Sequence, residues 1–201
     1  MYILEPLQQF FDELSRDWDK RQPDGRERTL YRLMAHFDAL LCKDSCILEA
    51  GCGTGALLPV LRQRYMNASL AAVDLSLQML QQMNGRRQGA TLAQADVHFL
   101  PFEDHCFSSV ICHDSFPHFQ QKHNALAEFK RVLMEDGRLF ILHDISRERV
   151  NAVHRRSHDT IIHHDMLPDV HMLSQMLQES GFELVFTRDD ANCFVMVAVV
   201  I

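Results

Sequence analysis

The stretch "ILEAGCGTGALLPVL", residues 47–61, decides the fold. An apolar run leads into three glycines at alternate positions, Gly51, Gly53 and Gly55, and an apolar segment with helical character follows. Glycine adopts positive φ angles without strain and lets the backbone approach a ligand closely. A glycine turn between a buried strand and a helix therefore predicts a ligand site at this point.

The spacing of the glycines restricts the class of ligand. A dinucleotide site usually has the pattern G-x-G-x-x-G, whereas this chain has G-x-G-x-G, preceded by Glu49. An acidic side chain disfavours a pyrophosphate and suits a positively charged ligand. A tight turn that binds nothing is the structural alternative.

Outward from this turn, strand-like and helix-like segments alternate. Strands are expected within 45–51, 69–75, 90–96, 107–115 and 138–146, and helices within 56–65, 76–87, 121–134 and 167–181. A turn is expected at 135–137, and two apolar runs, 182–189 and 193–201, are joined by a polar turn that fits a β-hairpin. The alternation predicts an α/β, Rossmann-like, doubly wound sheet that is mostly parallel, with a C-terminal antiparallel hairpin and N-terminal capping helices.

Composition and charge restrict the class of protein. The chain has 201 residues, which fits a single domain, 1–201. A formal net charge of −7 argues against a nucleic-acid partner, and no apolar run is long enough for stable membrane insertion. Six cysteines without a CxxC pair favour free thiols in a reducing compartment, so we expect a cytoplasmic protein.

Two acidic residues stand where further strands are expected to end. Asp74 comes nineteen residues after Gly55, at the end of the second expected strand, and is placed to accept hydrogen bonds from ribose hydroxyls. Asp96 ends the third expected strand, where it would meet the amino group of an adenine. In this order, a glycine turn and two acids predict a nucleoside ligand.

Together these segments resemble the class I S-adenosylmethionine-dependent methyltransferases, in particular the small-molecule branch that includes ubiquinone and menaquinone methylases. The resemblance covers nearly the whole chain. It is carried by "ILEAGCGTG", "AAVDLS", "QADVHFLPFEDHCFSSVIC", "FKRVLMEDGRLFILHD" and "GFELVFTRD".

The resemblance implies a cofactor site. It assigns to S-adenosylmethionine the residues Glu49, Gly51, Gly53, Gly55, Asp74, Leu75, Asp96 and Val97. In it the glycines line the methionine and ribose part, Glu49 lies near the cationic end, Asp74 holds the ribose, and Asp96 with Val97 frames the adenine. The segment "FFDELSRDWDK" is similar to the N-terminal segment that lies over the cofactor pocket in these enzymes.

The implied activity is methyl transfer to a small-molecule acceptor, with S-adenosylhomocysteine as the product. Residues 1–42 would form a helical cap, and residues 146–171 a lid that sets the choice of acceptor.

Histidines are concentrated where the acceptor is expected. Six of the 12 histidines fall between His143 and His171. Candidates for a catalytic or acceptor-orienting role are His113, His118, His143 and His154. Candidates for a divalent metal site are His154, His158, His163 and His164, because residues four apart on a helix share one face.

Three interpretations of these histidines stay open: hydrogen-bonded structural groups, catalytic groups, and ligands of a metal or of a metal-bearing substrate. The last leaves an alternative function, either a non-catalytic cofactor- or metal-binding protein that uses the histidine-rich segment 143–171 or a methyltransferase acting on a metal-bearing substrate.

Overall fold

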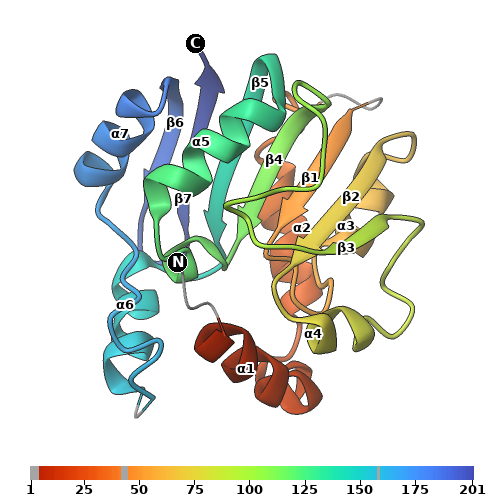
Figure 1. The fold of residues 1–201 in the computed structure, drawn as a ribbon, viewed down its shortest axis with the longest axis vertical. Coiled ribbons are helices and arrows are strands. Elements are labelled where there is room, and N and C mark those ends of the chain that lie inside the picture. The colour runs from red at the N-terminus through yellow and green to blue at the C-terminus, as the bar shows by residue number, and fades with distance from the viewer. Residues whose placement is uncertain (1–4, 42–44, 158) are drawn as a thin grey trace.

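A computed structural model describes residues 5–41, 45–157 and 159–201. Its centre is one seven-stranded sheet in the order β3-β2-β1-β4-β5-β7-β6 (Figure 1). The strands are β1 Cys46–Ala50, β2 Ser69–Asp74, β3 Thr91–Gln94, β4 Phe107–His113, β5 Leu133–His143, β6 Phe182–Asp189 and β7 Phe194–Val200. Strands β1 to β5 run parallel, and β7 pairs antiparallel with both β5 and β6. The expected Rossmann-like sheet with its antiparallel C-terminal pair is confirmed.

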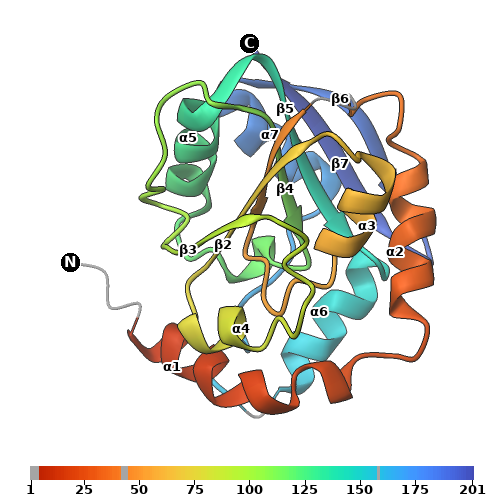
Figure 2. The same cartoon turned by 90° about the vertical axis from the view of Figure 1, so that its right-hand side faces the viewer.

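Helices cover both faces of the sheet, and further helices lie at one edge. They are α1 Glu5–Leu14, η1 Ser15–Asp17, η2 Asp19–Arg21, α2 Arg26–Ala35, α3 Leu58–Arg64, α4 Leu77–Gln81, η3 Phe116–His118, α5 Lys122–Val132, α6 Arg147–Arg156 and α7 Val170–Glu179. Helices α5 and α7 lie on one face, and α2 and α3 on the other (Figure 2). Helices α1, α4 and α6 lie together at the lower edge, toward which β1 and β4 point (Figure 1).

Apolar side chains on the two faces of the sheet form two separate cores. Leu126 and Phe129 of α5 pack in the first, and Leu30 of α2 with Leu58 of α3 in the second. Strand β1 contributes Leu48 to one core and Ile47 to the other, as alternation along a strand requires. The continuous apolar run that opens the decisive stretch is thus explained by burial of the strand on both faces.

Two elements differ from their predicted extents. The helix expected over 76–87 ends at Gln81, because Asn84, Gly85 and Gln88 all adopt positive φ in the segment that follows. The turn expected at 135–137 lies inside β5 as an irregularity, where the pairing with β4 jumps from Phe107↔Leu133 to Ser109↔Arg138. No described helix is both long enough and apolar enough for a membrane span.

The N-terminal segment is fastened across the edge of the sheet at which the parallel strands end. Asp12 of α1 accepts a hydrogen bond from the Ser76 hydroxyl at 2.5 Å. Asp19 of η2 accepts one from the Thr54 hydroxyl at 2.7 Å and pairs with Arg86 at 2.6 Å. The chain therefore places α1 and η2 against the loops that follow β1 and β2.

A third contact is made by a buried cation. Arg26, in the first turn of α2, lies 2.5 Å from Asp114 and 3.3 Å from Asp144, which follow β4 and β5. Its side chain is only 13% exposed, so the two carboxylates share one guanidinium largely out of water. Removing one partner of such an arrangement leaves an uncompensated charge.

We expect Arg26→Gln to lower the free energy of unfolding by about 3 kcal/mol, because two partly buried carboxylates lose their cation. Urea unfolding at constant pH measures the change. Arg28→Gln, an exposed residue on the same helix, is the matched control and should change stability by less than about 0.5 kcal/mol. Equal effects of the two substitutions would show that the Arg26 pairs contribute nothing to folding.

Candidate functional site

The glycine turn closes tightly against the next loop of the sheet. The amide of Gly51 donates to the carbonyl of Val73 at 2.9 Å, and Gly51 has a φ of +73°. A Cβ atom at this position would lie 2.5 Å from the Cβ of Ser115, whose hydroxyl donates to the carbonyl of Ala50 at 2.7 Å. Only glycine satisfies both the backbone angle and this close approach.

A pocket lies beyond the carboxyl ends of β1, β2 and β4, where ligands bind in open α/β sheets. The glycine turn, the ends of the strands and the N-terminal segment all contribute to its wall. Its lining residues are Leu7, Phe11, Trp18, Arg26, Glu49, Gly51, Cys52, Gly53, Thr54, Ala56, Asp74, Leu75, Met79, Ala95, Asp96, Val97, His98, His113, Asp114, Ser115, His118 and Phe119. Seven of the eight residues assigned to a cofactor are among them; Gly55 lies behind the turn, against Met83 and Leu58.

Asp74 is the last residue of β2 and organises the floor of the pocket. One carboxylate oxygen accepts from the amide of Gly53 at 2.7 Å, and the other from the amide of Ser76 at 2.9 Å. Burial raises the pKa of Asp74 to about 6, although these two backbone hydrogen bonds act to lower it. Asp74 thus ties the glycine turn to the start of α4.

Glu49 is the least compensated acid in the pocket. It is 2% exposed, and its Oε2 atom has no hydrogen-bond partner among the described residues. Burial, reinforced by the neighbouring Asp74, raises the pKa of Glu49 to about 8, while Arg26 acts in the opposite direction. A buried carboxyl without a partner is the position at which a cationic ligand group gains most.

Asp96 lies two residues beyond the end of β3 and is held by its own loop. Its Oδ1 atom accepts from the amide of His98 at 3.0 Å and lies 2.5 Å from Nδ1 of the same histidine. Burial alone would raise the pKa of Asp96, but the two hydrogen bonds from His98 outweigh it and lower that pKa. Leu75 and Val97 flank these acids in the pocket wall.

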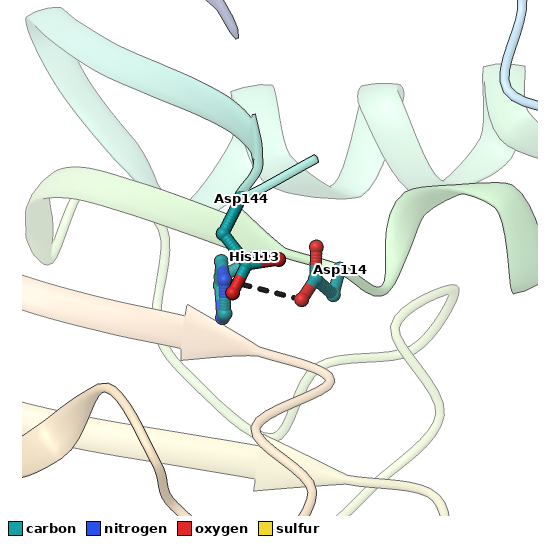
Figure 3. Close-up of side chains that lie close together, drawn as sticks. All are labelled: His113, Asp114 and Asp144. Atoms are coloured by element: carbon teal, nitrogen blue, oxygen red, sulfur yellow. Dashed lines mark ion pairs between the residues drawn. The ribbon is translucent and has the colours of Figure 1, made fainter. Parts of the chain in front are cut away.

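A cluster of titratable groups stands where β4 and β5 end. Figure 3 shows the side chains of His113, Asp114 and Asp144 gathered together, with His113 Nε2 lying 3.2 Å from Asp114. His143 Nδ1 lies 3.1 Å from the other oxygen of Asp114. Burial would raise the pKa of Asp114, but His113, His143 and Arg26 outweigh it and hold that pKa well below its usual range. Burial lowers the pKa of His113, which favours the neutral ring.

This cluster is the one group of three that meets the spacing of a metal site among the described residues. Arg26 already lies against both carboxylates, so their charge is balanced by a cation of the chain itself. A divalent ion at this place would have to displace a buried guanidinium.

The four catalytic candidates fall into two groups. His113 and His143 belong to the cluster around Asp114, and the Nε2 atom of each is enclosed without a hydrogen-bond partner among the described residues. His118 and His154 lie together elsewhere, with ring centroids 4.9 Å apart, and of these two only His118 lines the pocket. The sequence could not predict which histidines would lie together, because the contact between His118 and His154 depends on how α6 packs.

The expected metal ligands His154 and His158 stay a prediction, because His158 lies outside the described residues. Helix α6 ends at Arg156, and Ser157 is extended. His163 and His164 contact each other in a turn, with ring centroids 4.8 Å apart, while Nδ1 of His154 is engaged by the backbone carbonyl of Asp165.

Two residues in or near the pocket escaped the sequence patterns. In the sequence, residues 20–28 look like a polar linker, yet Arg26 begins α2. Asp165 sits in an irregular stretch between α6 and α7. Both act through contacts with residues far away in the chain, so local spacing carries no signal for them. His98 is different, because its partner is local. Asp96 stands two residues before it, just after a strand, and this spacing does indicate a hydrogen bond between the two.

Comparison with known proteins agrees with this architecture. Residues 48–141 match the family model described as "Methyltransferase domain". A malonyl-[acyl-carrier protein] O-methyltransferase of Geobacter sulfurreducens is 34% identical over 115 residues, which are 56% of this chain and 43% of that protein. A demethylmenaquinone methyltransferase of Thermotoga maritima is 30% identical over 96 residues, 48% of this chain and 42% of that protein. The chain therefore spans less than half of these relatives.

Among solved structures, magnesium protoporphyrin IX methyltransferase of Synechocystis with bound S-adenosylhomocysteine superposes with a TM-score of 0.74 at 16% identity, covering 98% of this chain and 99% of that one. At that identity the match establishes the fold alone. The resemblance seen in the sequence is confirmed: residues 48–141 are similar to a methyltransferase domain, the matching relatives are methyltransferases, and the fold is that of a solved methyltransferase with bound S-adenosylhomocysteine.

Proposed function

We propose that the chain transfers a methyl group from S-adenosylmethionine to a small-molecule acceptor. The observation that carries this proposal is the buried, unpartnered carboxyl of Glu49 beside the glycine turn, in a pocket that also contains Asp74. An excess of buried acid in one pocket favours a ligand that has cationic groups and hydroxyl donors. S-adenosylmethionine has both.

The residues present fit this cofactor. Gly51 and Gly53 would face its methionine part, Glu49 its cationic end, and Asp74 with Leu75 its ribose. Asp96 and Val97 would frame its adenine. When bound, the cofactor supplies an electrophilic methyl group on a sulfonium centre.

The chain's own contribution is to position the acceptor and to exclude water. Phe11 and Trp18 of the N-terminal segment form part of the pocket wall, and Phe11 contacts both Trp18 and His118 edge to face. Residues 1–42 would thus act as the cap and residues 146–171 as the acceptor lid; α6 supports this second role, because His154 on it contacts His118.

No step of this proposal needs a divalent metal, since methyl transfer from a sulfonium is a displacement that the cofactor itself enables. A cytoplasmic location is part of the proposal. It is supported by the five described cysteines, Cys46, Cys52, Cys106, Cys112 and Cys193, which are all free thiols.

The first test is to trace the label after incubation of the pure protein with methyl-labelled S-adenosylmethionine and cell extract. We expect the label in the organic or small aqueous fraction. Label in protein or nucleic acid would contradict the acceptor class. Absence of transfer by a protein that binds the cofactor would contradict the enzymatic role.

Asp74→Ala is expected to weaken S-adenosylhomocysteine binding at least ten-fold, or about 1.4 kcal/mol, because the ribose loses its acceptor and the glycine turn its anchor. Titration calorimetry measures the affinity, and thermal unfolding checks that the variant is folded. Glu135→Ala, which removes an exposed acid on β5, is the control and should bind normally. Unchanged affinity in Asp74→Ala would remove Asp74 from the site.

Glu49→Gln tests the raised pKa. Because the folded-state pKa of Glu49 is about 8 instead of 4.5, ionising it costs stability as the pH rises. The stability of the wild type relative to Glu49→Gln should therefore fall between pH 5 and pH 9, by roughly 1.4 kcal/mol for each unit of pKa difference. Denaturant unfolding across that range measures it, with Glu135→Gln as a control that shows no such trend.

The same substitution probes the ligand. A cation beside Glu49 favours the ionised carboxylate, so the affinity for S-adenosylmethionine should rise from pH 6 to pH 8 in the wild type and rise less in Glu49→Gln. Parallel pH profiles in the two proteins would place the cationic end of the cofactor elsewhere.

A further inference from the structure

We propose that His118 is the general base for an acceptor that is neutral, planar and attacks through a hydroxyl oxygen, and that Asp165 is the residue that positions His118. This inference rests on the proposed methyl transfer and adds to it the chemical class of the acceptor. It is carried by an imidazole at the pocket wall whose rear nitrogen is held by a buried carboxylate.

His118 closes the short helix η3, next to the pocket. Its Nδ1 atom lies 2.8 Å from a carboxylate oxygen of Asp165, a residue 47 positions away along the chain. Within the described part of the chain, its Nε2 atom makes no hydrogen bond. Unlike the Nε2 atoms of His113 and His143, it is not enclosed by protein. The His118 side chain remains 15% exposed, so a ligand in the pocket can reach it.

Asp165 is itself held firmly in place. Its side chain is 9% exposed, and its second oxygen accepts from Nε2 of Gln120 at 3.3 Å. The side chain of Asn151, on α6, donates to the carbonyl of Leu167 at 3.0 Å and accepts from its amide at 2.8 Å. His154, one turn further along α6, hydrogen-bonds to the backbone carbonyl of Asp165. Two buried side chains of one helix therefore fix the backbone from which the carboxylate projects.

This arrangement sets the tautomer of His118. An ionised carboxylate only accepts hydrogen bonds, so Nδ1 carries the hydrogen and Nε2 keeps its lone pair. The other histidines of the pocket wall lack such a nitrogen. In His98, Nδ1 meets Asp96 and Nε2 accepts from the amide of Gln121, and in His113, Nε2 is enclosed beside Asp114.

The charges of the pocket select the acceptor. Glu49, Asp74, Asp96 and Asp114 are acidic, and Arg26, the one lysine or arginine that lines the described pocket, is paired with Asp114 and a second carboxylate. An anionic acceptor would therefore find no unpaired cationic side chain in the described pocket. A neutral hydroxyl has no such need, but it must lose its proton to become a good nucleophile, and this requires a base.

The shape of the wall favours a flat acceptor. Phe11 stands edge-on to His118 with ring centroids 5.1 Å apart, and Trp18 and Phe119 add two further aromatic rings to the pocket lining. Rings of this kind pack well against a planar molecule. A phenol or a cyclic enol combines this shape with the required hydroxyl.

The step balances as a displacement. The lone pair of His118 Nε2 takes the hydroxyl proton, the acceptor oxygen forms a bond to the methyl carbon, and the carbon–sulfur bond breaks with its electron pair left on sulfur. The products are a methyl ether, S-adenosylhomocysteine and an imidazolium, which returns its proton to solvent.

The first test observes His118 without turnover. In protein labelled with ¹⁵N-histidine and saturated with S-adenosylhomocysteine, we expect the His118 ring to carry its hydrogen on Nδ1. His118→Asn assigns the signals by removing them. In Asp165→Asn the ring should lose this fixed tautomer. An unchanged tautomer in Asp165→Asn, or a hydrogen on Nε2 in the wild type, would overturn the positioning role.

The second test uses the acceptor identified by label from cell extract. His118→Asn should lower kcat by about 10²- to 10⁴-fold, while S-adenosylhomocysteine affinity changes less than two-fold. Asp165→Asn should also lower kcat, by less than His118→Asn, because the imidazole remains but is no longer held by a carboxylate. His123→Asn, an exposed histidine on α5, is the control and should leave kcat unchanged.

The outcomes separate the two proposals. If the wild type binds S-adenosylhomocysteine and the label appears on a hydroxyl oxygen, the acceptor class stands. Label on an amine, a carboxylate or a carbon, or full activity in His118→Asn, would overturn this inference and leave the methyl transfer intact. Failure of the wild type to bind S-adenosylhomocysteine would overturn the proposed function itself.

Discussion

The structure depends on how negative charge is buried at one edge of a parallel sheet. A carboxylate removed from water must receive hydrogen bonds or a counter-charge, or remain protonated. Each solution occurs here: backbone amides surround Asp74, and Arg26 serves both Asp114 and Asp144. Glu49 has neither for its Oε2 atom, and its pKa rises to about 8. The acids that have amides or a counter-charge hold the loops together, and Glu49 is the position at which the proposed cationic ligand group would gain most.

Sequence patterns predicted the sheet and the edge at which its pocket lies, and they did so for a physical reason. Strands buried on both faces read as continuous apolar runs, and the turn after β1 requires glycine at residue 51. Acids at strand ends are local features too, so Asp74 and Asp96 could be placed from their position after a strand. All these signals lie within a few residues of the feature that they predict.

The acceptor side could not be predicted in the same way. The relation of His118 to Asp165, and of Arg26 to Asp114, joins segments 47 and 88 residues apart. Four histidines were candidates in the sequence; packing enclosed the Nε2 atoms of His113 and His143, and only His118 combines a place at the pocket wall with an Nε2 atom that is not enclosed. The shared face inferred from the spacing of residues 154 and 158 stays a prediction, because residue 158 lies outside the described residues.

The position of β7 has a consequence for the order in which the molecule is completed. This strand is the last of the described strands along the chain, but it lies inside the sheet, between β5 and β6, and pairs with both along its length. During synthesis, β6 has no neighbouring strand to pair with until β7, which ends at Val200, has emerged. Asp189 of β6 is the partner of Arg147 on α6, so this ion pair also waits for β7. The segment that holds Asp165 behind His118 therefore gains this support only when the final strand is in place, and every earlier intermediate exposes an open edge of β5.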